Sequence, residues 1–265
     1  MSKRQKVIFT CKNFKYMSNF VLILGESGTG KSTSLSTLNP LETFIFNSGQ
    51  KPLPFRGSKN MYKTVIKEGT NQISKAKSNI VPERNMSIIA MDIKKIADNR
   101  PEIKNIICDD IAYALLESVF SRFDEKNYDK FKIFAKELKE LIDSTKNLRE
   151  DLTIVLMNHV EYDTDSMGSR RVIFKMPAGK FTKEALVPEG LFDTVLYAEC
   201  SREGEENKYF FRTQNSGNDT CKSPLGMFPG IRIPNDMQYV IDSYIAYHNG
   251  KEMPEPKSVK IGENF

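Results

Sequence analysis

The sequence lacks the features that would place it in a specialised class of protein. No apolar run approaches the roughly 20 residues that a membrane-spanning helix needs, so we expect no membrane contact. The basic N-terminus is followed by an apolar stretch too short for a signal peptide. The four cysteines are far apart, without the spacing of a zinc site or a disulfide framework: Cys11, Cys108, Cys200 and Cys221. We therefore expect a reduced protein in the cytoplasm.

A strong excess of one charge is also missing. The chain has 39 Lys and Arg residues against 34 Asp and Glu residues, a net charge of +5. This balance permits an anionic partner but lies far from that of a dedicated nucleic-acid arm. Hydrophobic residues make up 39% and charged residues 28% of the 265 positions, as in an ordinary globular protein. We expect one domain over residues 1–250 and a polar tail over residues 251–265.

Short apolar runs are present, and they suit strands buried on both faces of a parallel sheet. They cover residues 20–24, 43–47, 105–108 and 152–157. Apolar residues at helical spacing follow over 111–123, up to Phe120 and Phe123, and over 130–148. Alternating strands and helices predict a parallel sheet with right-handed crossovers and helices on its faces.

The remainder of the chain departs from this alternation. Residues 48–82 carry Gly and Pro and then many lysines. The runs 192–199 and 208–213 alternate in polarity, and we expect both to be strands added antiparallel to an edge of the sheet. A final amphipathic helix is expected to close the domain with one apolar face, formed by Met237, Val240, Ile241, Tyr244 and Ile245.

The stretch "LILGESGTGKSTS", residues 22–34, matches the pattern G-x-x-x-x-G-K-[ST] directly after an expected strand. Glycines in this pattern let successive N–H groups point at phosphate oxygens. Lys31 would place a positive charge on the β- and γ-phosphates of ATP, and the Ser32 hydroxyl would ligate Mg²⁺. A chance glycine-rich turn is the alternative. The expected nucleotide-binding residues are Gly25, Glu26, Ser27, Gly28, Thr29, Gly30, Lys31, Ser32 and Thr33.

A phosphate loop needs an acidic partner at the end of a neighbouring strand. The run 104–115 supplies an apolar strand that ends in Asp109 and Asp110. Asp109 stands directly at the strand end, so we expect it to hold Mg²⁺ together with Ser32. Asp110 either polarises the attacking water or caps the next helix.

The expected strand over residues 152–157 ends in Asn158 and His159. Ligands of open α/β sheets bind at this carboxyl edge. Either side chain is a candidate to contact the γ-phosphate or the attacking water. A loop histidine whose hydrogen bonds are satisfied by the backbone is the alternative.

Taken together, the motifs resemble phage-encoded RecA-like ATPases of the single-strand annealing and recombination type. The resemblance covers about residues 18–248, through "GESGTGKST", "IICDD", "IVLMNHVEY" and "KYFFRTQNSGNDTCKSPLGMFPGIRIPNDMQYVI". The last segment is the most particular, with Gly217, Lys222-Ser223-Pro224 and Pro234-Asn235-Asp236 at the family's positions. Residues 178–199 also look like the family.

This resemblance implies a RecA-like P-loop NTPase fold: a mainly parallel central sheet flanked by helices, with antiparallel strands added at the C-terminal side. It also implies a homo-oligomer, a ring or a filament, with ATP between subunits and basic residues completing the neighbour's site. Arg212 and Lys222 are the candidates at the matching positions, and solvated hairpin charges are the alternative.

In such RecA-like proteins the strand after the phosphate-loop helix ends in a catalytic glutamate. Here "FIFNSGQK" has no carboxylate, and Gln50 is the nearest polar candidate. Either Asp110 takes that role or hydrolysis is slow.

Basic residues gather at two places where single-stranded DNA could bind. The first group is Arg56, Lys59, Lys63, Lys67, Lys75 and Lys77, against one acid, Glu68. Arg170 and Arg171 form the second group. Such surfaces bind phosphate backbones with strong salt dependence. Phe55 and Tyr62 are placed to stack bases. Solvated surface is the alternative for both groups, and the sequence shows no helix-turn-helix or zinc finger.

Three functions are compatible with these features. The first is a recombination ATPase that anneals or pairs single strands, for which a single-strand-binding protein or a nuclease is a candidate partner. Such a protein, if phage-encoded, would act in the cytoplasm of a bacterial host. The second is a nucleotide-switched assembly or regulatory module that does not bind DNA. The third is a small-molecule kinase, for which residues 201–207 would make a poor lid.

Overall fold

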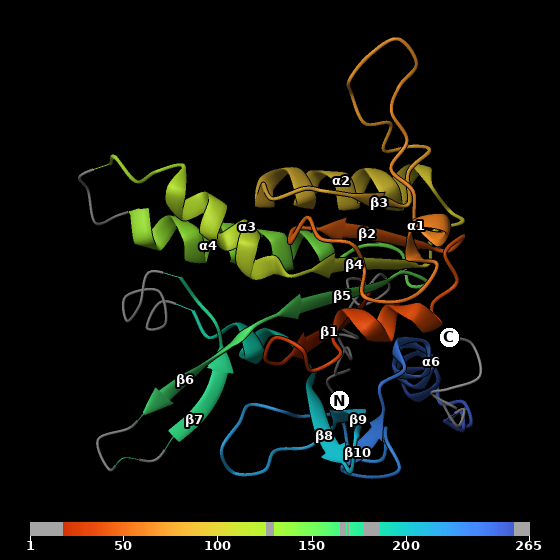
Figure 1. Ribbon diagram of the computed structural model, residues 1–265, viewed down its shortest axis with the longest axis vertical. Helices are drawn as coiled ribbons and strands as arrows, with labels where there is room; N and C mark the ends of the chain where they lie inside the picture. The colour runs from red at the N-terminus through yellow and green to blue at the C-terminus, as the bar shows by residue number, and fades with distance from the viewer. Residues whose placement is uncertain (1–17, 126–129, 165–167, 169, 178–185, 257–265) are drawn as a thin grey trace, which may run out of the picture.

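The computed structural model of the chain describes residues 18–125, 130–164, 168, 170–177 and 186–256. Its centre is an eight-stranded sheet in the order β10-β9-β8-β1-β5-β4-β2-β3, and β6 and β7 form a separate hairpin (Figure 1). The strands are β1 (Asn19–Leu24), β2 (Thr43–Asn47), β3 (Ile80–Val81), β4 (Asn105–Asp109), β5 (Thr153–Asn158), β6 (Val160–Thr164), β7 (Arg170–Phe174), β8 (Thr194–Glu203), β9 (Glu206–Arg212) and β10 (Arg232–Pro234).

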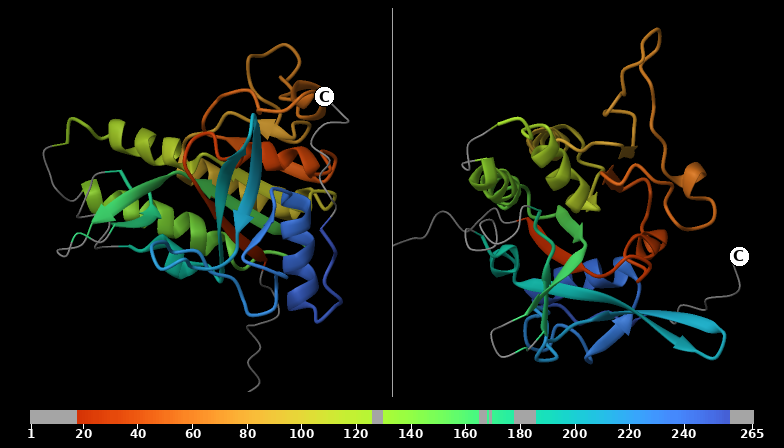
Figure 2. Two further views of the ribbon diagram at one scale, coloured as in Figure 1. Left: turned by 60° about the horizontal axis from the view of Figure 1, so that its bottom comes forward. Right: turned by 60° about the vertical axis from the view of Figure 1, so that its left-hand side comes forward.

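Helices cover both faces of the sheet. The helical elements are η1 (Ser32–Thr37), α1 (Ser58–Met61), α2 (Met86–Asn99), α3 (Ile111–Phe120), α4 (Lys130–Thr145), η2 (Pro188–Leu191) and α6 (Met237–His248). In Figures 1 and 2, α2, α3 and α4 lie on one face and η1 and α6 on the other. Among the described residues, no helix is long and apolar enough to cross a membrane.

The expected fold class is confirmed. From β3 through β2, β4, β5 and β1 to β8 every neighbouring pair is parallel, and β9 and then β10 are added antiparallel at the β8 edge. One core packs under α2, α3 and α4 and a second under η1 and α6, and alternate strand residues such as Leu22 and Ile23 enter opposite cores. Each fully buried residue of this size contributes about 1.5–3 kcal/mol.

The expectation that the run 192–199 is antiparallel to the sheet is wrong. Strand β8 pairs parallel with β1 from Thr194 to Tyr197, and only β9 is antiparallel to it. Its first five residues are buried, whereas its last five, Glu199 to Glu203, pair with β9 alone and are mostly exposed. Most of the run 192–199 thus lies in the buried half of β8, and its polarity carries no information about strand direction.

The expected helices are confirmed in position, with differences at their ends. Helix α3 ends at Phe120, and the side chains of Phe120 and Phe123 are 66% and 70% exposed, so they do not join the expected apolar face. Four of the five residues expected on the apolar face of α6 are buried: Met237, Val240, Ile241 and Tyr244. Residues 257–265 of the expected tail lie outside the described residues, as do Cys11 and residues 178–185.

Helix α2 and the β6–β7 hairpin were not predicted from the sequence. The signals for α2 were an N-cap, Asn85, whose side chain accepts a hydrogen bond from Ile88 N at 3.1 Å, and apolar residues at helical spacing. Ile89, Ile93 and Ile96 are buried against the core.

Candidate nucleotide-binding site

The phosphate loop connects β1 to η1 at the carboxyl edge of the sheet. Gly28 and Gly30 have φ of 80° and 89°, a region that residues with a side chain rarely adopt. A Cβ on Gly30 would lie 2.8 Å from Tyr209 Cδ1, and one on Gly25 would lie 2.9 Å from the carbonyl oxygen of Ala198. The glycines of the motif are thus required by backbone conformation and by the packing of β8 and β9 against the loop.

Lys31 is held inside this loop. Its Nζ donates hydrogen bonds of 2.8 Å to the carbonyl oxygens of Gly25 and Glu26, and the residue is buried. Burial lowers the pKa of Lys31, while the carboxylates of Asp110, Asp109 and Glu26 oppose that effect. The ammonium group therefore lies over the loop, where phosphate oxygens would replace its present carbonyl partners.

Ser32 and Asp109 meet as the sequence predicted. The Ser32 hydroxyl donates to Asp109 Oδ1 at 3.0 Å. Burial, and then the charge of Asp110, raise the pKa of Asp109 to about 7. A hydroxyl and a buried carboxylate side by side match the oxygen ligands that Mg²⁺ uses beside a phosphate loop. The residues present therefore fit Mg²⁺, with Ser32 and Asp109 as its holders.

Asp110 does not cap helix α3 through its side chain. It occupies the cap position with φ of 56° but makes no capping hydrogen bond, and its Oδ1 lies 3.2 Å from His159 Nε2. Burial raises the pKa of Asp110, but the hydrogen bond and charge of His159, with the charges of Lys31 and Lys51, outweigh it and leave the pKa below its usual value. Of the two aspartates, Asp110 is thus the one that favours the ionised form, and an ionised carboxylate can polarise a water molecule.

Asn158 is buried beside these residues. Its Nδ2 donates to the carbonyl oxygens of His159 at 3.0 Å and Lys175 at 3.1 Å, while its buried Oδ1 has no partner among the described residues. The amide thus fixes the backbone where β5 passes into β6. His159 is partly exposed and faces Asp110, so of the two it is the one whose side chain reaches the candidate catalytic carboxylate.

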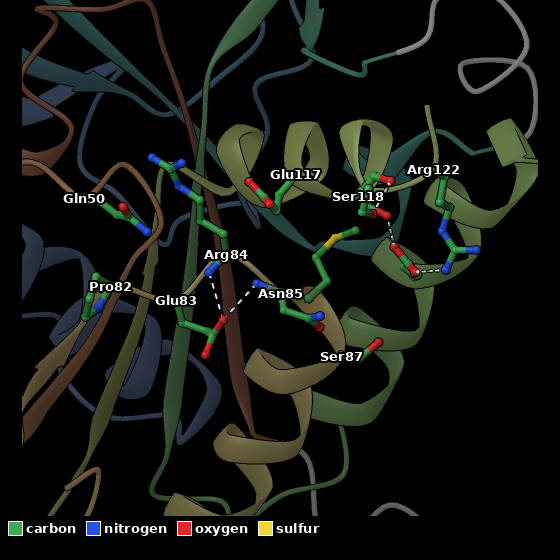
Figure 3. Close-up of a pocket in the computed structure, with 12 residues that line it drawn as sticks. Gln50, Pro82, Glu83, Arg84, Asn85, Ser87, Glu117, Ser118 and Arg122 are labelled. Atoms are coloured by element: carbon green, nitrogen blue, oxygen red, sulfur yellow. Dashed lines mark hydrogen bonds and ion pairs between the residues drawn. The ribbon is translucent and has the colours of Figure 1, made fainter. Parts of the chain in front are cut away.

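The end of β2 brings no carboxylate to the site. Gly49 packs against Asp110, since a Cβ there would lie 3.1 Å from Asp110 Oδ2. Gln50 has φ of 54° and is exposed. It lines a cavity of about 570 Å³, together with Arg84, Glu117 and others shown in Figure 3. Sequence reasoning missed the residue that follows, Lys51, whose Nζ donates to Tyr113 Oη at 2.9 Å.

A second cavity, of about 400 Å³, lies on the other side of the loop and contains Arg212. The Arg212 guanidinium bonds Asp219 Oδ2 at 2.9 Å and also pairs with Glu199. Lys222 forms an isolated β-bridge with Val195. The role of Arg212 and Lys222 across a subunit boundary stays a prediction.

The two groups of basic residues differ in ion pairing and solvent exposure. Lys75 of the first group pairs with Glu83 and Asp92 and is held in the fold. Tyr62 is buried, which contradicts its expected role in base stacking, and its ring packs at 6.3 Å from that of half-buried Phe55. The segment between α1 and β3 nevertheless projects from the body (Figure 1), with Lys63 and Lys67 exposed on it.

The second basic group contacts the phosphate loop. The Arg170 guanidinium lies 3.8 Å from the centroid of the Tyr162 ring. The Tyr162 hydroxyl in turn donates a hydrogen bond to Glu26 of the loop. Both Arg170 and Arg171 are exposed on β7, and the turn between β6 and β7 lies partly outside the described residues. The hairpin therefore joins exposed cations to the nucleotide site.

The chain is similar to a known domain family over most of its length. The family described as an AAA domain matches residues 17–225. The chain belongs to this AAA-domain family. No curated protein matches it. Among solved structures, the KaiC-like protein PH0186 from the hyperthermophilic archaeon Pyrococcus horikoshii OT3 is similar with a TM-score of 0.40 and 14% identity, over 74% of this chain and 78% of that one. The family match places the chain among AAA-domain ATPases, and its substrates and partners have to be argued from the site.

Proposed function

We propose that this AAA-domain protein binds ATP and Mg²⁺ in its phosphate loop and hydrolyses ATP as an oligomer acting on single-stranded DNA. It would promote annealing or pairing of strands in the cytoplasm. The observation that carries the proposal is the contact between the basic hairpin and the phosphate loop, from Arg170 through Tyr162 to Glu26.

The site residues divide the chemistry between them. The loop N–H groups and Lys31 would bind the phosphates, and Ser32 and Asp109 would hold Mg²⁺. Bound Mg²⁺ neutralises charge on the β- and γ-phosphates. Asp110, ionised and oriented by His159, would accept a proton from the attacking water. Because β2 supplies no carboxylate, Asp110 has this task alone, and we expect slow turnover without DNA.

DNA would act through the hairpin. A phosphate backbone bound at Arg170 and Arg171 would draw Arg170 away from the Tyr162 ring, since a cation bound to phosphate gains more than from an exposed aromatic ring. Tyr162 would then change its contact with Glu26, beside Lys31. In this way DNA binding would reach the residues that hold the nucleotide.

The test measures ATP hydrolysis at low salt with and without single-stranded DNA. We expect DNA to stimulate the wild-type protein and the Arg170→Ala/Arg171→Ala variant to lose most of the stimulated increment. The control is Lys94→Ala/Lys95→Ala, which removes two exposed charges from α2. Equal loss in both variants, or no stimulation of the wild-type protein, would contradict the proposal.

A second candidate is a nucleotide-switched assembly module that does not bind DNA. The end of β2 favours it, because a site with no carboxylate from that strand can hold ATP without turning it over quickly. Sizing the protein with ATP or ADP, and titrating labelled single-stranded DNA at rising salt, separates the two. ATP-dependent assembly without salt-sensitive DNA binding would support the switch.

A further inference from the structure

The turn that follows β2 holds a cation beside the candidate catalytic carboxylates. Strand β2 pairs with β4, with Asn47 opposite Asp109. The turn is closed by Asn47, whose Nδ2 donates to the carbonyl oxygen of Lys51 at 2.7 Å and whose carbonyl accepts from Gln50 N at 3.1 Å. Gly49 allows this turn to pack against Asp110. Lys51 therefore leaves the sheet next to Asp109 and Asp110.

Tyr113 is the residue on which two cations converge. It lies one turn into α3, where its N–H bonds the carbonyl of Asp110 at 3.0 Å. Lys51 Nζ lies 4.9 Å and Arg84 Cζ 5.7 Å from the centroid of its ring, and Arg84 Nε donates to the carbonyl oxygen of Ser48 at 2.8 Å. In Figure 3 the Arg84 guanidinium lies at the opposite end of the cavity from Arg122.

The two cations differ from Asp110 in their contacts with oppositely charged groups. In the part of the chain that the structure describes, neither Lys51 nor Arg84 forms an ion pair, whereas the Asp110 carboxylate lies 3.2 Å from His159 Nε2. The hydrogen bond to Tyr113, and then the charges of Asp110 and Asp109, raise the pKa of Lys51. The charge of Lys51 is also among the causes that lower the pKa of Lys31, after burial. Two cations that form no ion pair among the described residues thus lie at the edge where a terminal phosphate would lie.

We propose that Lys51 is a second cationic contact for the terminal phosphate of a bound nucleoside triphosphate, with Tyr113 as its resting partner and Arg84 as a supporting positive charge. The proposal rests on the proposed function, because it needs a nucleotide in the phosphate loop. Lys51 is exposed and its stem is flexible, so Nζ can exchange the Tyr113 hydroxyl for a phosphate oxygen. A charge-assisted hydrogen bond to phosphate is the stronger of the two.

The test compares the affinities for ATP and ADP by equilibrium titration at fixed Mg²⁺. Lys51→Ala should weaken ATP binding about 10- to 100-fold, the worth of one charge-assisted hydrogen bond, and change ADP binding less than about twofold. Lys51→Arg should restore most of the difference. Lys94→Ala, which removes an exposed lysine from α2, is the control and should change neither affinity.

The role of Tyr113 is tested separately. Tyr113→Phe removes the hydroxyl that holds Lys51 in the unliganded protein, so ATP affinity should rise a few-fold while ADP affinity stays constant. A fall in ATP affinity would overturn its role as a resting partner. A melting curve of each variant checks that the fold is intact.

The outcomes separate this proposal from the proposed function. If the wild-type protein binds no ATP, or binds it as well after Lys31→Ala, the nucleotide site itself is wrong. If ATP binding depends on Lys31 but Lys51→Ala weakens ATP and ADP equally, or neither, Lys51 does not contact the terminal phosphate. If Lys51→Ala lowers only single-stranded DNA binding, the cations serve nucleic-acid phosphates, and the proposal fails.

Discussion

Two cationic side chains flank the phosphate loop, and they stand in opposite electrostatic states. On the β8–β9 side, Arg212 is held by Asp219 at 2.9 Å and by Glu199, which also pairs with Arg232. On the β2–β4 side, Lys51 has a tyrosine hydroxyl as its partner. A cation already paired with two carboxylates is bound into the fold, whereas one without a carboxylate is available to an incoming anion. Proximity to the loop alone does not distinguish the two.

The largest effect on ATP binding is expected for Lys31, which lies in the phosphate loop between Arg212 and Lys51. Lys31→Ala removes the only lysine inside the loop and should weaken ATP binding at least about 100-fold, because a buried charge-assisted contact to two phosphates is lost. Equilibrium titration with ATP measures this. Unchanged affinity would show that the nucleotide does not bind in this loop.

Arg212 and Lys51 should then differ in their effect on stability. Arg212→Ala leaves Glu199 and the buried Asp219 carboxylate without their partner, so the free energy of unfolding should fall by about 1–3 kcal/mol. Lys51→Ala should change it by less than about 0.5 kcal/mol, as for other surface substitutions. Urea denaturation of both variants measures the difference. Equal values would mean that the ion pairs of Arg212 contribute little.

The adjacent aspartates should show opposite effects on stability in the absence of Mg²⁺. The folded-state pKa of Asp109, about 7, exceeds that of an unfolded Asp, so the native state holds an extra proton between about pH 4 and pH 7. Stability contributed by that protonated state is lost as pH rises through this window. At pH 8 with a chelator, Asp109→Asn should therefore raise the melting temperature by a few degrees.

Asp110→Asn is the matched control at the same strand end. The pKa of Asp110 is lowered in the folded state, so its contribution is present above the unfolded pKa and is lost as pH falls through the folded value. At pH 8 this variant should melt at a lower temperature than the wild-type protein. Shifts of the same sign in both variants would contradict the assigned roles.

The smallest effects on stability and DNA binding are expected in the first basic group. This group contains both ion-paired lysines and exposed lysines. Lys75→Ala removes a partner of Glu83 and of buried Asp92 and should lower stability by about 1 kcal/mol. Lys67→Ala, on the projecting segment, should leave stability unchanged and reduce the salt slope of single-stranded DNA binding by about one unit. Identical salt slopes in both variants would remove this segment from the DNA surface.

The local geometry of the candidate nucleotide site could be predicted from the sequence to a useful extent. A strand followed by "GESGTGKST", and a second strand ending in Asp109, put Ser32 and Asp109 within 3.0 Å of each other as expected. Both signals are local, because each consists of a strand and the residues that directly follow it or end it. The direction of β8 was predicted wrongly, because polarity along a strand does not encode which neighbour it pairs with. Lys51 was missed because its relevance depends on Tyr113, which lies 62 positions away.

The sequence by itself determined the α/β class, the phosphate loop and the two aspartates, because short apolar runs and glycine spacing act through local backbone preferences. The tertiary structure alone decided which charges are neutralised. Pairing of Arg212 with Glu199 and Asp219 requires β8, β9 and the turn after β9 to meet in space. The contact of Asp110 with His159 requires the ends of β4 and β5 to meet. Coulomb energy depends on the distance between charges and on their burial, and both are set by the folded structure rather than by neighbouring residues in the sequence.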